Sequence, residues 1–267
     1  MHRRSSYEFD AATPPLNFGV RDRTERVSGK ALVKLVVLDV DGTLLDNLES
    51  EDVCFAAALR EGLGVTTLNT DWRTYEHVTD KGIAVEAYQR AFSVPPSAKR
   101  VTQAVDRFLT LLAEAHARVP LRPVAGARDL LAELPTRGWF PALATGAWER
   151  AARFKLTAAG LRVDQLPLAT AEDGPARIAI VRAALARAER KCSPFERVVL
   201  VGDGVWDVAA AQALGLPFVG RASLDRAQEL RARGVGAVLS HFTDIEMVLA
   251  VLETAGPPLE TYGNRCG

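Results

Sequence analysis

The chain carries four aspartates just after two apolar runs that we predict to be strands. Asp39 and Asp41 follow the first run, and Asp203 and Asp207 follow the other. Because parallel strands end at one edge of a sheet, we expect these four carboxylates to lie close together. Such a group repels itself unless a cation neutralises it, and oxygen ligands without His or Cys favour Mg²⁺. The acids therefore predict a magnesium site.

A second set of residues could bind an anion at the same sheet edge. Thr145 and Gly146 follow another predicted strand and offer a hydroxyl and a backbone amide ahead of a predicted helix, whose N-terminus attracts anions. Arg177 begins a further predicted helix and adds donors suited to phosphate. Acids for a metal beside donors for an anion indicate phosphoryl transfer, in which positioning and charge stabilisation provide most of the catalysis.

An alternation of strand and helix patterns predicts the fold that would position these residues. The strand runs are apolar without polar alternation, which is typical of parallel strands covered on both faces. Helical patterns lie between them, which indicates βαβ units with right-handed crossovers. The predicted strands are 35–38, 139–144, 166–169, 198–201, 217–219 and 237–239, and the predicted helices are 127–134, 148–159, 177–190, 205–214 and 245–252.

A helical segment interrupts this alternation after the first strand. Residues 47–122 read as helices, broken by Ser93–Ser97, and the alternation resumes after Pro123. We predict a flexible tail over 1–30, an α/β core made of 31–46 and 123–267, and a helical cap over 47–122. Such an insertion would lie over the carboxyl ends of the strands, where open α/β sheets bind ligands.

The order of the motifs resembles the haloacid dehalogenase superfamily. The chain reads Asp39-Val40-Asp41-Gly42-Thr43, then Thr145-Gly146, then a basic residue, then Gly202-Asp203-Gly204-Val205-Trp206-Asp207. The resemblance covers about residues 34–250 and is greatest to small-molecule phosphatases with a helical cap, relatives of phosphoglycolate phosphatase and β-phosphoglucomutase. It implies an α/β fold, a Rossmann-like parallel-sheet core with an inserted all-helical cap domain.

The same resemblance implies a role for each matching residue. Asp39 would be the nucleophile that forms an aspartyl-phosphate, and Asp41 would protonate the leaving group and then deprotonate water. The implied phosphate-binding residues are Thr43, Thr145, Gly146 and Arg177. The implied Mg²⁺ ligands are Asp39, Asp41 (through its backbone carbonyl), Asp203 and Asp207, the last of which would steady the metal or its water.

Two residues compete for the basic position of the third motif. Arg177 lies just ahead of a predicted helix, as the resemblance requires. Lys155 lies in the middle of an amphipathic helix, where we expect a surface lysine whose stem packs along apolar neighbours. We favour Arg177 and keep Lys155 as the alternative.

One segment of the insertion resembles the substrate-reading loop of capped relatives. Thr79, Asp80, Lys81 and Gly82 combine polar groups with a glycine between helical stretches. By that similarity they are candidates to contact the substrate, and Lys81 could bind a carboxylate or a second phosphate. The alternative is a solvated turn between helices.

The amino-acid composition limits the classes of binding partner that we expect. Among 267 residues, Lys plus Arg (33) equals Asp plus Glu (33), so net charge gives no attraction to nucleic acid or to an anionic membrane. The three cysteines form no disulfide or zinc pattern. The N-terminal segment lacks an apolar signal core, and no run is long enough to span a membrane. We expect a soluble, cytoplasmic protein that acts on a small phosphorylated metabolite; the sequence fixes neither the metabolite nor the oligomeric state.

Other functions remain open at this point. A phosphomutase of the β-phosphoglucomutase type would use the same chemistry and return the phosphoryl group to a sugar. A non-catalytic binding protein could keep the fold. A phosphonatase would need a cap lysine that forms a Schiff base, for which Lys81 is the candidate. A dehalogenase is disfavoured because those enzymes lack the second aspartate of the first motif, which Asp41 supplies here.

Overall fold

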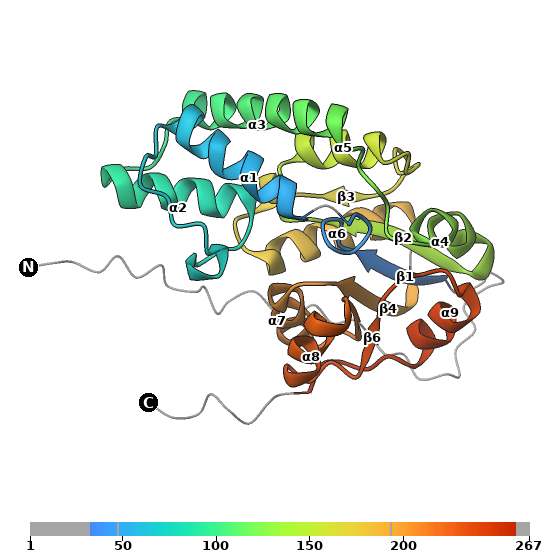
Figure 1. Ribbon diagram of the computed structural model, residues 1–267. Helices are drawn as coiled ribbons and strands as arrows, with labels where there is room; N and C mark the ends of the chain where they lie inside the picture. The colour runs from blue at the N-terminus through green and yellow to red at the C-terminus, as the bar shows by residue number, and fades with distance from the viewer. Residues whose placement is uncertain (1–32, 47, 193, 260–267) are drawn as a thin grey trace, which may run out of the picture. The chain divides into compact units, whose positions relative to one another are not determined.

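The computed structural model describes residues 33–46, 48–192 and 194–259. The predicted tail over residues 1–30 lies outside this part of the chain. The described residues belong to one compact unit, built from a parallel sheet with flanking helices and a helical insertion (Figure 1).

A six-stranded parallel sheet in the order β3-β2-β1-β4-β5-β6 forms the centre of this unit. The register places Leu38, at the end of β1, beside Leu143 of β2 and Val201 of β4. The predicted parallel α/β fold is therefore confirmed. The strands are β1 (Val33–Leu38), β2 (Trp139–Ala144), β3 (Leu168–Ala169), β4 (Phe195–Gly202), β5 (Phe218–Arg221) and β6 (Ala237–Leu239).

Helices cover both faces of the sheet, which explains the continuous apolar runs in β1 and β4. Val36 and Val199 belong to a buried cluster that includes side chains of α4 (Ala127–Glu133), α5 (Glu149–Ala158) and α9 (Ile245–Thr254). Val37 and Leu200, one residue further along, line a small space with Val181 of α6. Successive side chains of a strand point to opposite faces, so both sides of β1 and β4 are buried.

The remaining core helices are α6 (Arg177–Lys191), α7 (Val205–Leu214) and α8 (Leu224–Ala232). The predicted helices that became α4, α5, α6, α7 and α9 all exist, with ends shifted by at most a few residues. We did not predict α8. Its apolar residues, among them Ala227 and Leu230, recur every third position among charged residues, which is a weak helical signal.

The insertion between β1 and β2 is helical, as expected. It contains α1 (Leu48–Ala58), a π-helical turn (Leu59–Leu63), a 3₁₀ turn (Trp72–Thr74), α2 (Asp80–Phe92) and α3 (Ala98–Arg118). The two chain segments that lead into and out of it pair with each other: the amide of Asp46 donates to the carbonyl of Arg122 at 3.1 Å, and that of Val124 to Leu44 at 2.9 Å. The insertion thus leaves and re-enters the core at one point. The exact domain boundaries stay a prediction.

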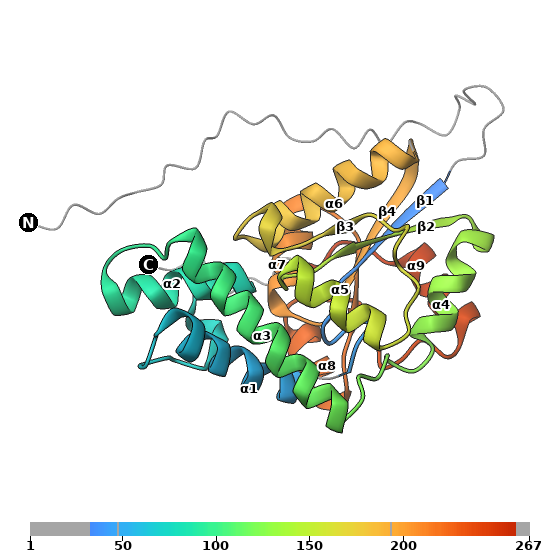
Figure 2. The same cartoon turned by 90° about the horizontal axis from the view of Figure 1, so that it is seen from above.

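The insertion has an apolar core of its own, which extends into the α/β part. Phe55 of α1 and Phe108 of α3 pack against Trp148, whose ring precedes α5, with ring centroids 5.5 and 5.9 Å from that of the indole. Helices α3 and α5 also lie side by side in both views (Figures 1 and 2). Aromatic burial of this kind stabilises the insertion and holds it against α5.

None of the helices within the described residues is long and apolar enough to cross a membrane.

We predict that Phe108→Ala lowers the free energy of unfolding by about 3–5 kcal/mol, because it opens a cavity beneath a side chain that is fully buried. Chemical denaturation measures the change. Phe92→Ala is the matched control, since Phe92 is 46% exposed and its truncation should cost below about 1 kcal/mol. Equal losses for the two variants would contradict the packing described here.

Candidate active site

Three of the four predicted aspartates form one cluster at the carboxyl edge of the sheet. Asp39 follows β1, Asp203 follows β4, and Asp207 lies in the first turn of α7. Their exposures are only 4%, 3% and 6%, and one carboxylate oxygen from each lies within 4.8 Å of the others. Strands β1 and β4 are neighbours, so their ends bring residues far apart in the chain to one place.

Two arginines face this cluster. Nη1 of Arg177, at the start of α6, donates to Oδ1 of Asp39 at 3.0 Å, and its Nε lies 3.1 Å from Oδ1 of Asp207. Nη1 of Arg226, in α8, donates to Oδ2 of Asp203 at 2.8 Å. Each of the three carboxylates therefore has a guanidinium partner, but within the described part of the chain these three acids share two cations.

The pKa values of the cluster reflect its burial first and this excess of negative charge second. Burial, followed by the charge of Asp207, raises the pKa of Asp39 to about 8, although Arg177 opposes the change. Burial and the charge of Asp39 raise the pKa of Asp203 to about 7. Burial raises the pKa of Asp207 to about 6, against the effect of Arg177. The site resists full ionisation unless further positive charge enters it.

The donor set fits a hard divalent cation. It consists of carboxylate oxygens, with no imidazole or thiolate among its three members, which suits Mg²⁺ rather than zinc or copper. Gly42 leaves the space that this cluster needs: a Cβ there would lie 2.1 Å from Oδ2 of Asp203, and its φ of +80° favours glycine. The fourth predicted ligand, Asp41, has its carboxylate outside the cluster; a role for its backbone carbonyl stays a prediction.

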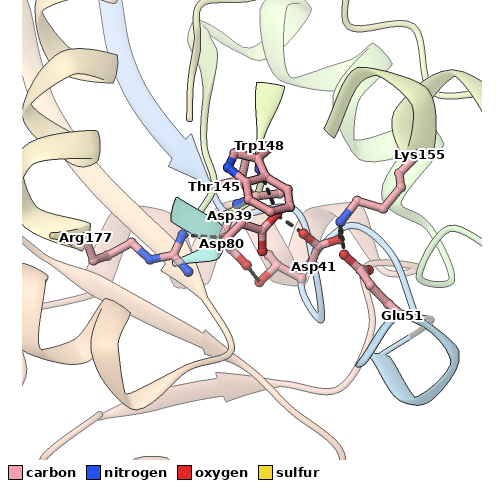
Figure 3. Close-up of polar contacts among 10 residues, drawn as sticks. Asp39, Asp41, Glu51, Asp80, Thr145, Trp148, Lys155 and Arg177 are labelled. Carbon is pink, nitrogen blue, oxygen red and sulfur yellow. Dashed lines mark hydrogen bonds and ion pairs between the residues drawn. The ribbon is translucent and has the colours of Figure 1, made fainter. Parts of the chain in front are cut away.

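The predicted anion-binding residues lie around Asp39 and Asp41. The hydroxyl of Thr43 donates to Oδ2 of Asp39 at 3.2 Å. Thr145 is 1% exposed, and its Oγ1 accepts a hydrogen bond from the amide of Ala147 and lies 3.5 Å from Oδ2 of Asp41. Gly146 lies beside the Arg177 guanidinium, which would be 3.1 Å from a Cβ at that position. Figure 3 shows the Arg177 guanidinium pointing toward Asp39.

The side chain of Asp41 points toward Lys155 (Figure 3). Nζ of Lys155 donates to Oδ1 of Asp41 at 2.7 Å and also pairs with Glu51 of α1. Burial disfavours the ammonium, but the charges of Asp41 and Glu51 outweigh it and hold the pKa of Lys155 above its ordinary value. Burial, then the charge of Asp41, raises the pKa of Glu51 to about 8.

Lys155 corrects one expectation. We predicted a surface lysine with a solvated head, yet its exposure is 0%. An amphipathic pattern places a residue on a helix face but does not show what that face meets, and here two acids lie opposite. Of the two candidates for the third-motif cation, Arg177 is the one in contact with Asp39, whereas Lys155 contacts Asp41.

The predicted substrate loop lies against the core. Thr79 caps α2 through the amide of Gly82 at 3.1 Å and donates its hydroxyl to the carbonyl of Pro175 at 2.9 Å. The amide of Asp80 donates to the carbonyl of Gly146, and its Oδ2 accepts from the amide of Trp148, both at 2.8 Å. Burial raises the pKa of Asp80 to about 7, although Lys155 opposes the shift.

These contacts join the start of α2 to the loop after β2. They give Thr79 and Asp80 a docking role in addition to any contact with a substrate. Lys81 is half-buried and makes no ion pair with a described residue. Its predicted substrate role stays a prediction.

Sequence reasoning missed two charged residues of the site. Arg226 lies in the helix that we did not predict, so nothing indicated that it faces Asp203. Glu51 is one of several acids in the stretch that begins α1, and only the position of Lys155 distinguishes it from Asp52. Arg226 and Glu51 each contact a residue far away in the chain, and a local sequence pattern does not predict such contacts.

The parallel α/β fold with acidic residues at the carboxyl ends of its strands can be compared with known proteins. The family model described as haloacid dehalogenase-like hydrolase matches residues 33–215. The match spans more than half of the chain, so the protein belongs to the haloacid dehalogenase-like hydrolase family. No curated protein sequence matches it significantly.

Solved structures share the fold at low sequence identity. A hydrolase from Pseudomonas syringae has a TM-score of 0.61 at 18% identity, with 82% of this chain and 98% of that chain covered. CbbY from Rhodobacter sphaeroides, in complex with phosphate, has a TM-score of 0.61 at 22% identity, with 80% and 96% covered. A predicted phosphoglycolate phosphatase from Haemophilus somnus has a TM-score of 0.55 at 19% identity, with 83% and 100% covered.

The raised pKa of Asp203 predicts a pH-dependent stability difference in the presence of a chelator. Between the ordinary value of 3.8 and about 7, the folded protein keeps a proton on Asp203 that the unfolded chain releases. Rising pH across this window therefore favours the unfolded chain. Asp203→Asn cannot release a proton, so the stability of the wild type relative to this variant should fall as the pH rises through the window.

Chemical denaturation at several pH values measures this difference. Asp164→Asn is the control, because Asp164 is exposed and has no pairing with a described residue, so its difference from the wild type should stay nearly constant. A wild type that gains stability over Asp203→Asn with rising pH would contradict the electrostatic picture.

Proposed function

We propose that the protein is a Mg²⁺-dependent phosphatase that hydrolyses a small phosphomonoester through an aspartyl-phosphate on Asp39. The observation that carries the proposal is the juxtaposition of the buried Asp39, Asp203 and Asp207 cluster with Arg177 and Thr145. Membership of a hydrolase family does not define a substrate. This arrangement, however, combines groups that could bind the negative charge of a phosphate ester with a carboxylate that could attack its phosphorus.

The residues divide the work of two displacements. In the first, an oxygen of Asp39 attacks phosphorus, the bond from phosphorus to the leaving oxygen breaks, and that oxygen takes a proton from Asp41. In the second, water attacks the phosphorus of the aspartyl-phosphate and gives a proton to Asp41. The bond from Asp39 to phosphorus then breaks and inorganic phosphate leaves.

Charge stabilisation accompanies both steps. Arg177, in contact with Asp39, is placed to bind the phosphoryl oxygens, together with the Thr145 hydroxyl and the Gly146 amide. A Mg²⁺ ion held by Asp39, Asp203 and Asp207 would supply the positive charge that offsets the dianionic phosphoryl group. Thr43 holds the Asp39 carboxylate in place.

We place the leaving group in a pocket at the boundary between insertion and core. A pocket of about 300 Å³ is lined from the insertion by Trp72 and Arg73 and from the core by Trp206 and Arg226, among others. Arg226 connects it to Asp203 of the cluster. Its volume and mixed polar and aromatic lining suit a small polar molecule. Residues 79–82 do not line this pocket, so we propose that the segment around Trp72 reads the substrate as well.

Phosphate transfer to a sugar is the alternative outcome of the same chemistry. The pocket and the site suit a phosphomutase equally, so the products decide between them. A panel of phosphorylated metabolites with Mg²⁺ should release inorganic phosphate in the proposed case. Conversion of one sugar phosphate into its isomer, with little phosphate released, would instead favour a phosphomutase.

We predict that Asp39→Asn abolishes phosphate release, a loss of about 10⁴-fold or more, because no carboxylate remains to take the phosphoryl group. Asp41→Asn should lower the rate by about 10²–10⁴-fold, the usual contribution of general acid–base catalysis. A chelator should remove the activity and added Mg²⁺ should restore it. Steady-state assays on the best substrate of the panel measure all three effects.

Asp164→Asn serves as the control, with activity close to that of the wild type. Full activity of Asp39→Asn would eliminate Asp39 as the nucleophile. An inactive wild type that binds phosphorylated ligands with Mg²⁺ would instead favour a non-catalytic binding protein.

A further inference from the structure

A fully buried lysine joins the α/β core to the helical insertion beside the candidate acid–base residue. Lys155 projects from α5, and its ammonium lies between Asp41, in the loop after β1, and Glu51, in the first helix of the insertion (Figure 3). A buried ammonium is costly unless carboxylates surround it. Here the two partners come from different parts of the fold, so the lysine fixes one relative to the other.

We propose that Lys155, held by Glu51, is the positioning residue for Asp41. The inference rests on the proposed function, because it assigns Lys155 and Glu51 a role in the proton transfers of that reaction. Neither residue touches the reacting atoms: Lys155 acts through Asp41, and Glu51 acts through Lys155.

The two oxygens of Asp41 have different surroundings. Oδ1 accepts the hydrogen bond of Lys155 at 2.7 Å, whereas Oδ2 faces the hydroxyl of Thr145 at the looser distance of 3.5 Å. Thr145 belongs to the group around Asp39 that would hold the phosphoryl group. Lys155 thus anchors one oxygen and leaves the other directed to the place where the leaving oxygen develops charge.

Glu51 provides the second half of the constraint. Its side chain is 14% exposed and lies on α1, so it holds the ammonium from the side of the insertion. Without Glu51, the Lys155 ammonium could move together with the Asp41 carboxylate as that carboxylate rotates. Lys155 would then no longer fix the orientation of Asp41. Catalysis is sensitive to such freedom, since a misplacement of about 1 Å can cost about 10²-fold in rate.

Stability alone is a poor reason for this arrangement. Replacing a buried ion pair by apolar side chains of similar volume is often neutral or stabilising, so a purely structural position could hold a methionine. The neighbouring Leu156 and Ala152 on α5 are themselves buried and apolar. What Lys155 adds, and an apolar residue could not, is a directional contact with Asp41.

The nature of the leaving group separates positioning from a structural role. An alkyl phosphate releases a strongly basic alkoxide, which needs the proton of Asp41. The leaving group of p-nitrophenyl phosphate is weakly basic and needs no proton. The ratio kcat/KM reports only the steps up to release of the leaving group, so a misplaced Asp41 should lower it for the alkyl substrate and spare the aryl one.

The experiment compares Lys155→Met and Glu51→Gln with the wild type on an alkyl phosphate from the metabolite panel and on p-nitrophenyl phosphate. We expect Lys155→Met to lower kcat/KM about 10²-fold for the alkyl phosphate and less than about threefold for the aryl phosphate. Glu51→Gln should give a smaller loss with the same dependence on the leaving group. Asp41→Asn sets the limiting pattern, and thermal melting verifies that each variant is folded.

A double-variant cycle adds a second readout. If Lys155 acts through Asp41, then Asp41→Asn/Lys155→Met should be no slower on the alkyl phosphate than Asp41→Asn alone. Arg153→Met is the matched control, since it removes a cation from the exposed side of the same helix and should leave both substrates unaffected.

The outcomes distinguish the inference from the proposed function. Equal losses on the two substrates, or multiplicative losses in the double variant, would overturn the positioning role while leaving the phosphatase intact. A wild type inactive on both substrates would overturn both proposals. If Lys155→Met fails to fold, Glu51→Gln decides: unchanged selectivity between alkyl and aryl phosphate would overturn the inference.

Discussion

The site depends on negative charge concentrated where water is scarce. Asp39, Asp203 and Asp207 lie together at the sheet edge with exposures of 4%, 3% and 6%, and among the described residues two guanidinium groups pair with them. Burial and mutual repulsion raise the pKa of each acid, so a bound cation would favour the ionised form of the cluster. The fold imposes this closeness, because β1 and β4 are adjacent and parallel and both end there.

Buried acids also lie around Asp41, but there the protein itself supplies the neutralising positive charge. Lys155 brings its own positive charge to Asp41 and Glu51, so that pair of acids has a fixed cation. The two aspartates of the first motif, Asp39 and Asp41, therefore have different cationic partners. Asp39 faces Arg177 and the proposed metal, and both of these cations must also be free to bind the phosphate of a substrate. Asp41 faces a permanent partner, which favours a fixed orientation over exchange.

Much of the fold could be predicted from the sequence, because the patterns that indicate strands and helices are local. Continuous apolar runs such as Val36–Leu38 predicted buried parallel strands, and the motif residues at their ends predicted where Asp39, Asp41, Asp203 and Thr145 would gather. What it could not carry were contacts between distant elements. Arg226 lies in α8, whose helical pattern is weak, and Lys155 looked like a surface residue because nothing in α5 shows that Asp41 and Glu51 lie opposite. Single-sequence patterns locate faces and ends of elements, whereas pairing across elements depends on the packed structure.

Calorimetric titration of the metal-free protein with Mg²⁺ at constant pH tests the proposed cation site most directly. We predict binding to a single site in the wild type and in Asp164→Asn, and no measurable binding at that site in Asp203→Asn. Unchanged Mg²⁺ binding in Asp203→Asn, or none in the wild type at any pH above the raised pKa values, would contradict a cluster of buried acids built to hold a cation.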